Sequence, residues 1–152
     1  MKYVSALALI ASTSLAHAAC DGASALAAVT ECPVRVFAAE EISLEAFKWT
    51  ARPIVVFADS PLDPAFQTQM DNFAAEISDV VERDIVLITD TDPDGGSELR
   101  TALRPRGFQL VLIGKDGGVK LRKPFPWDMR EISRTIDKMP MRQREITEDR
   151  GS

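Results

Sequence analysis

Two continuous apolar runs, separated by one periodic segment, dominate the middle of the chain. The runs cover residues 54–58 and 85–89 and are rich in β-branched residues, which is typical of strands buried on both faces of a parallel sheet. Between them, apolar residues recur every three or four positions from Phe66 to Val80, so a long helix ending near Arg83 has one apolar face. The pattern therefore predicts a strand–helix–strand unit with a right-handed crossover.

The second half of the chain predicts a short helix, a hairpin and a last helix. We expect a helix over 97–103, strands over 108–113 and 119–122 joined by a turn at 115–118, and a last helix that Asp128 and Glu131 open as a capping box. The order β-α-β-α-β-β-α indicates a thioredoxin-like α/β fold, a mixed sheet with helices on both faces. A truncated flavodoxin-like sheet or another mixed α/β sandwich is the alternative at this point.

The N-terminal residues have the three parts of a secretory signal. Lys2 is followed by an apolar run over 4–15 and then by Ala16-His17-Ala18, a small-x-small cleavage site. We expect a signal peptide over 1–18 and a periplasmic location. The alternative is a membrane anchor, but the run is shorter than the roughly 20 residues that span a bilayer. Lipid attachment at Cys20 is disfavoured, because His17 stands where a lipobox has an aliphatic residue.

Charge and histidine content exclude several classes of function. The 152 residues carry a formal charge of −5, which becomes −6 when Lys2 leaves with the leader. A nucleic-acid-binding surface is basic, so nucleic acid is not an expected partner. His17 is the only histidine, so the mature chain has no imidazole for a Ser-His-Asp site or a His-ligated metal. No later run is long enough for a bilayer span, and we do not expect an integral membrane protein.

Both cysteines precede the predicted domain. Cys20 and Cys32 lie in an N-terminal extension over 19–42, ahead of a domain over 43–140 and a charged, aperiodic segment over 141–152 that we expect to be a disordered tail. An even number of cysteines in an exported protein favours a disulfide. The alternative is a catalytic dithiol, but eleven residues separate the two sulfurs, without the C-x-x-C spacing of redox sites.

Several short stretches resemble an uncharacterised family of exported bacterial proteins, the domain of unknown function 4174. They are Trp49 with Arg52-Pro53-Ile54-Val55-Val56-Phe57-Ala58, the Asp-Pro helix start, Glu82-Arg83-Asp84 and Gly114-Lys115-Asp116-Gly117-Gly118. The resemblance covers roughly residues 43–140. That domain is similar to modules of certain animal secreted matrix proteins and is regarded as thioredoxin-like, which the resemblance implies here too. These motifs are mostly structural and imply no activity.

The thioredoxin pattern itself is incomplete in this chain. In thioredoxins, the helix that follows the strand corresponding to residues 54–58 starts with Cys-Gly-Pro-Cys. Here the four positions are Leu62-Asp63-Pro64-Ala65. The thioredoxin cis-proline would fall near Phe108 or Gln109. The attacking thiolate, the resolving thiol and the substrate-positioning proline are therefore missing, as is the helix-start cysteine of a peroxiredoxin. We expect no disulfide exchange at this position.

A set of polar and aromatic residues at the predicted strand ends forms a candidate binding edge. The carboxyl ends of parallel strands meet at one edge of the sheet, where such folds bind their ligands. Four acids there could hold Ca²⁺ through oxygen, although they lack the ligand spacing of a calcium loop, and capping and turn formation is the simpler interpretation. We expect no metal and no cofactor. The candidate residues are Asp59, Ser60, Asp63, Asp92, Asp94, Arg104 and Trp127.

Together these features predict an exported, non-catalytic binding module whose partner is a protein or an anionic molecule. Ser60 has no histidine or Ser-x-x-Lys partner to activate it as a nucleophile. Arginines and lysines around Arg104 and the hairpin either recognise an anion or protect an edge strand. The alternative function is a thiol–disulfide oxidoreductase that uses Cys20 and Cys32.

We predict that signal peptidase cleaves after Ala18, because the apolar run is short and is followed by Ala-x-Ala. Intact-mass spectrometry of protein from the native host should find Ala19 as the first residue. Retention of Met1, or a lipid on Cys20, would contradict the prediction.

Overall fold

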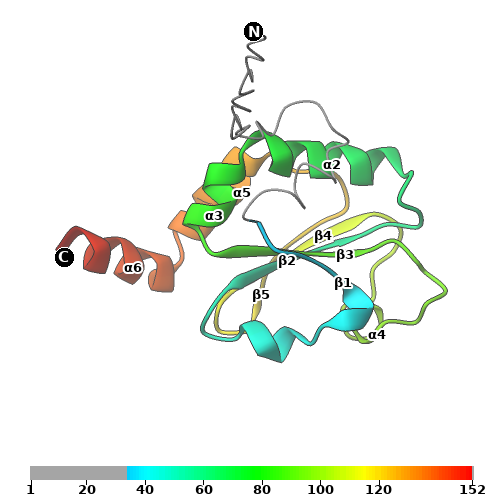
Figure 1. Cartoon of the computed structure of the whole chain (residues 1–152), viewed down its shortest axis with the longest axis horizontal. Helices are drawn as coiled ribbons and strands as arrows, with labels where there is room; N and C mark the ends of the chain where they lie inside the picture. The colour runs from blue at the N-terminus through cyan, green and yellow to red at the C-terminus, as the bar shows by residue number, and fades with distance from the viewer. Residues whose placement is uncertain (1–33, 152) are drawn as a thin grey trace, which may run out of the picture.

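A five-stranded mixed sheet forms the centre of the molecule (Figure 1). The computed structural model describes residues 34–151. The strand order is β1-β3-β2-β4-β5; β1, β2 and β3 are parallel, and β4 and β5 are antiparallel to their neighbours. This is the sheet of a thioredoxin-like fold, as predicted. The strands are β1 (Val36–Ala38), β2 (Arg52–Phe57), β3 (Ile85–Asp90), β4 (Gln109–Ile113) and β5 (Val119–Lys123).

The two predicted apolar runs form the centre of this sheet. All six residues of β2 are buried, and β2 pairs with β3 on one side and with β4 on the other. Alternate residues of β2 enter opposite cores, with Ile54 in one apolar cluster and Val55 in the other. Burial on both faces explains why these strands lack polar alternation.

Helices cover both faces of the sheet, as the sequence predicted (Figure 1). One face carries α2 (Pro64–Ala75), α3 (Ile77–Glu82) and α5 (Met129–Asp137), and the opposite face carries α4 (Glu98–Leu103) with the short helices η1 (Ala39–Glu41) and η2 (Leu44–Phe47). Within the described residues, none of these helices has the length and apolar character needed to cross a bilayer.

The single long helix predicted after β2 is divided at Glu76. This residue leaves the helical conformation, with φ −128° and ψ 47°, and its carbonyl accepts the N–H of Val80 at the start of α3. Phe73 before the break and Val80 after it are both fully buried. The apolar spacing continues across the break, so periodicity alone did not reveal it.

One strand of the sheet lies before the domain boundary predicted at residue 43. Residues 36–38 form the edge strand β1, which pairs in parallel with β3 through Phe37 and Ile88. Val34 and Ala39 beside it are buried. A strand of three residues has no readable alternation, and its partner lies some fifty positions away. The predicted signal peptide and both cysteines lie outside the described residues.

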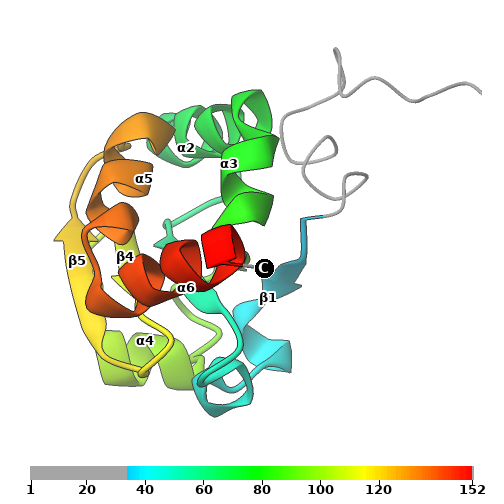
Figure 2. The same cartoon turned by 90° about the vertical axis from the view of Figure 1, so that its left-hand side faces the viewer.

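The predicted disordered tail is wrong, because the chain forms helix α6 (Pro140–Gly151) there. Figure 2, in which this end of the molecule faces the viewer, shows α6 in front of the sheet. Arg142 is buried and lies 2.9 Å from the Glu82 carboxylate, while Glu145 accepts from Arg52 at 2.8 Å and pairs with Lys115 at 2.9 Å. Ion pairs to residues distant in sequence, which no local apolar pattern records, therefore hold the helix.

We predict that Glu145→Gln lowers the free energy of unfolding by about 2 kcal/mol at neutral pH, because Arg52 loses a charge-assisted hydrogen bond. Burial alone would raise the pKa of Glu145, but hydrogen bonds from Arg52 and Lys115 outweigh it and hold this pKa below its ordinary value of 4.5. The stabilisation is therefore complete above pH 4.5 and is lost as pH falls through the lowered pKa.

Urea unfolding of the parent and the variant across this pH range tests the prediction. The difference between the two proteins should narrow below pH 4.5, the ordinary value for this carboxyl group. The exposed Asp149→Asn on the same helix is the control. A difference that stays constant with pH would contradict the role given to Glu145.

Candidate functional site

Four loops meet where β2 and β3 end. Phe57, the last residue of β2, pairs with Asp90 at the end of β3 and with Gln109 at the start of β4, and Lys123 at the end of β5 pairs with Leu110. The register therefore places the loops that follow or precede these residues at one end of the sheet. We call these loops, residues 58–63, 91–96, 104–108 and 124–128, the carboxyl-end surface.

The loop after β2 uses its polar side chains to start α2. Ser60 Oγ accepts the N–H of Leu62 at 3.1 Å, and the Asp63 carboxylate accepts the N–H of Ala65 at 2.8 Å as the N-cap of the helix. Asp59 is exposed and faces the neighbouring loop, where a Cβ added to Gly107 would lie 3.8 Å from its Oδ2. Ser60 and Asp63 therefore have capping roles in this structure.

The acids of the loop after β3 also form a turn. Asp92 Oδ1 accepts the N–H of Asp94 at 3.1 Å, and both side chains are exposed. In the part of the chain that the structure describes, no three acidic, cysteine or histidine side chains converge as metal ligands would. The acids share one end of the sheet, as the sequence predicted, but the geometry lends no support to a calcium site.

Trp127 anchors the loop before α5 instead of projecting into solvent. It is half-buried against the apolar cluster that contains Ile132. The Gln69 side chain on α2 holds its backbone, donating to the Trp127 carbonyl at 3.0 Å and accepting from the Trp127 N–H at 2.7 Å. Lys123 Nζ lies 4.3 Å from the centre of the indole. Trp127 thus packs as the apolar residue that precedes a helix cap.

Arg104 lies on the carboxyl-end surface and is exposed. It ends α4 in the left-handed conformation, with φ 48°, and its N–H donates to the Arg100 carbonyl at 2.8 Å. Such a conformation is uncommon for a residue with a side chain. Arg104 therefore acts as the residue that ends α4, and its charged side chain is left at the surface.

Two exposed apolar side chains on this surface were not singled out from the sequence. Leu62 is 82% exposed and Phe125 is 52% exposed, although both are large. Lys123 Nζ lies 5.8 Å from the Phe125 ring. The sequence does show that Leu62 directly precedes a helix cap and that Phe125 stands between two prolines. These positions alone do not tell whether the side chain turns toward the core or toward solvent.

Sequence reasoning also missed a buried ion pair beneath the surface. Asp90, fully buried at the end of β3, accepts from Arg100 Nε at 2.7 Å and from Ser97 Oγ at 2.5 Å. Arg100 also donates to the Ala58 carbonyl at 2.7 Å, and its guanidinium lies 5.5 Å from the centre of the Phe57 ring. One arginine thus ties α4 to the ends of both central strands.

We predict that Arg100→Met lowers the free energy of unfolding by about 3–5 kcal/mol, because it leaves the Asp90 carboxylate buried without a cation. Chemical denaturation measures the change. The double variant Asp90→Leu with Arg100→Met should recover part of the loss, since it removes both charges. A loss below about 1 kcal/mol for Arg100→Met, the range of exposed ion pairs, would contradict the role of this pair.

Comparison with known proteins adds a family and a structural neighbour. A solved structure of the mitochondrial 2-Cys peroxiredoxin from Plasmodium falciparum is similar to the chain with a TM-score of 0.46 and 16% sequence identity, over 63% of this chain and 79% of that one. The sequence also matches the domain of unknown function DUF4174 over residues 43–145, well over half of the chain. This range extends beyond the boundary expected at residue 140 and includes Arg142 and Glu145 of α6. The protein is thus a member of the DUF4174 family with a thioredoxin-like fold.

Proposed function

We propose that the protein is an exported, non-catalytic thioredoxin-like module that binds a protein partner through its carboxyl-end surface. The proposal of export rests on the signal-like residues 1–18, and the proposal of binding rests on the geometry at the start of α2. The cysteines of the extension, Cys20 and Cys32, have a structural role as a disulfide in this proposal.

The start of α2 carries the proposal. Thiol–disulfide exchange needs a thiolate, and helix N-termini are where such folds activate one. Here the N-cap is the Asp63 carboxylate, already bound to the Ala65 N–H, and Leu62 before it is 82% exposed. Residues 34–151 contain no cysteine. This end of the fold therefore offers an apolar contact where a redox protein offers sulfur.

The exposed side chains of the surface favour a protein partner with an apolar patch and charged groups around it. Leu62 and Phe125 supply large exposed apolar side chains, which commonly form the centre of a binding interface. Arg104 and Arg106 are exposed on the loop before β4, and Lys123 lies beside Phe125. Exposed aspartates on the other loops add negative charge, so the surface carries both signs, and complementary charges on a partner would fix its orientation.

The alternative function, a thiol–disulfide oxidoreductase, depends entirely on Cys20 and Cys32, the only cysteines of the chain. We expect the mature protein to show no reduction of insulin disulfides above a blank and no peroxidase activity. Turnover that is present in the parent and lost in Cys20→Ser with Cys32→Ser would establish the alternative.

Non-reducing peptide mapping of exported protein should show the two cysteines joined, and two free thiols would contradict their structural role.

A site-specific photo-crosslinker tests the binding surface. We expect p-benzoylphenylalanine in place of Leu62 to give a discrete adduct in intact cells, because this side chain faces the partner. The same group in place of Val119 is the control, since Val119 is 44% exposed but begins β5 at the opposite end of the sheet. Adding Arg104→Glu and Arg106→Glu should reduce the adduct at position 62. No adduct there, or equal adducts at both positions, would contradict the proposal.

A further inference from the structure

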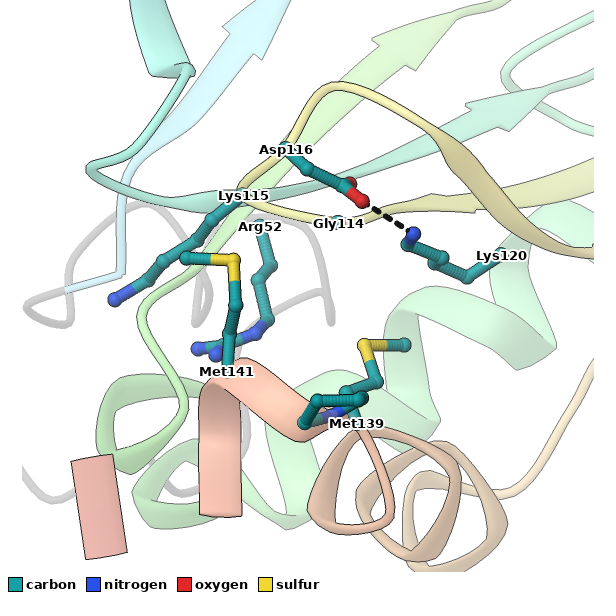
Figure 3. A pocket seen from close by; sticks show the side chains of 8 residues that line it. Arg52, Gly114, Lys115, Asp116, Lys120, Met139 and Met141 are labelled. Carbon is teal, nitrogen blue, oxygen red and sulfur yellow. Dashed lines mark hydrogen bonds and ion pairs between the residues drawn. The ribbon is translucent and has the colours of Figure 1, made fainter. Parts of the chain in front are cut away.

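A cavity of about 240 Å³ lies at the end of the sheet opposite to the carboxyl-end surface. Figure 3 shows it between the β4–β5 turn and the junction of α5 with α6. Its cationic lining residues are Arg52 at the start of β2, Lys115 in the turn and Lys120 on β5. Residues 139–141, Met-Pro-Met, close it from the helical side. The cavity therefore combines a charged side, which holds these cations and the Asp116 carboxylate, with an apolar side.

The cations are already held in place by acids. Arg52 donates to Glu145 at 2.8 Å and Lys115 pairs with Asp84 at 2.7 Å, and neither acid lines the cavity. Lys120 donates at 2.6 Å to Asp116, an acid that does line the cavity. An ammonium group has three N–H donors, so Lys120 keeps donors for a ligand. Since the acids neutralise much of the charge, a monoanion fits this site better than a multiply charged group.

A backbone irregularity directs Lys120 to the cavity. Leu121 pairs with Leu112 and Val119 pairs with Ile113, so Lys120 is an extra residue with no partner opposite. Such bulges re-aim a side chain and are frequent beside functional sites. A Cβ added to Gly114 would lie 2.6 Å from Lys120 Cε, so the lysine side chain passes close to this glycine. Bulge and glycine together place one ammonium group at the cavity.

The apolar side has room for a short carbon chain or one ring. An apolar cavity of about 150 Å³ accommodates benzene, and this one is larger, at about 240 Å³. Methionine side chains are flexible and polarisable, so Met139 and Met141 can adapt to the shape of a small apolar group. A strongly hydrated anion such as phosphate has no apolar part and would gain no binding free energy from this apolar side.

We propose that the cavity binds a small organic carboxylate, with the anion on Lys120 and the apolar part against Met139 and Met141. This site is separate from the protein-binding surface of the proposed function, and it depends on the docking of α6. The ligand class follows from the lining, which combines the Lys120 ammonium group with the flexible apolar side chains of Met139 and Met141.

Hexanoate is the probe, added to the ¹⁵N-labelled mature protein. We expect saturable amide shifts confined to residues 114–120 and 139–141, with a Kd of about 1 mM. Hexylammonium has the same chain and the opposite charge, acetate has the charge without the chain, and inorganic phosphate is a hydrophilic anion. Each should bind at least about tenfold more weakly than hexanoate, a difference of one decade in Kd.

Two variants locate the site. Lys120→Met keeps the length of the side chain without its charge and should weaken hexanoate about tenfold or more, whereas the exposed Arg130→Met, at the start of α5, should not. Gly114→Ala should weaken it too, because the new Cβ displaces Lys120. Thermal unfolding of each variant confirms that it is folded before binding is compared.

Several results would overturn the proposal. If Lys120→Met binds hexanoate as tightly as the parent does, or if hexylammonium binds as tightly as hexanoate, the cavity recognises only the apolar chain of the ligand. Stronger binding of phosphate than of hexanoate assigns the site to a hydrophilic anion. The absence of any saturable shift at about 10 mM hexanoate, about ten times the expected Kd, rejects the site altogether.

Discussion

The structure depends on the buried guanidinium of Arg52 at the end of the sheet where β2 and β3 begin, which we call the amino end of the sheet. Its side chain is 1% exposed at the start of the central strand, and a buried charge is tolerated only when it is paired and hydrogen-bonded. The Arg83 carbonyl and the Glu145 carboxylate accept from it at 2.9 and 2.8 Å. Glu145 belongs to α6, so the last helix is ordered because the first central strand begins with a cation. Glu145 also pairs with Lys115, which lines the cavity.

The two ends of the sheet use buried charge in the same way but present different surfaces. At the carboxyl end, the Asp90–Arg100 pair lies below the loops and leaves Leu62 and Phe125 exposed above it. At the amino end, the pairs around Arg52 lie beside an opening that the methionines of the α5–α6 junction close. Exposed apolar side chains suit a macromolecule, whereas a concave cavity suits a small molecule. The proposed protein partner and the proposed carboxylate follow from this difference.

Capping and turn formation account for the polar residues at the carboxyl end. Asp63, Ser60 and Asp92 each accept a backbone N–H within their own loop, so their oxygens serve turns and a helix start. The sequence allowed both interpretations, because a capping acid and a ligating acid are the same residue type at the same place. Only the hydrogen bonds distinguish them. In the proposed function, the surface offers a partner apolar area together with exposed arginines and aspartates.

Local pattern determined the central strands, the hairpin, the helices on both faces and the capping acids, because each depends on residues close together in the chain. The family likewise follows from local motifs, such as those around Arg52 and Gly114. Tertiary structure alone decided β1, the break at Glu76, α6 and the two buried ion pairs. These features join residues that lie far apart or interrupt a pattern that otherwise continues. An ion pair carries no periodicity, so neither the order of α6 nor the cavity beside it could be predicted before the strands had brought the charges together.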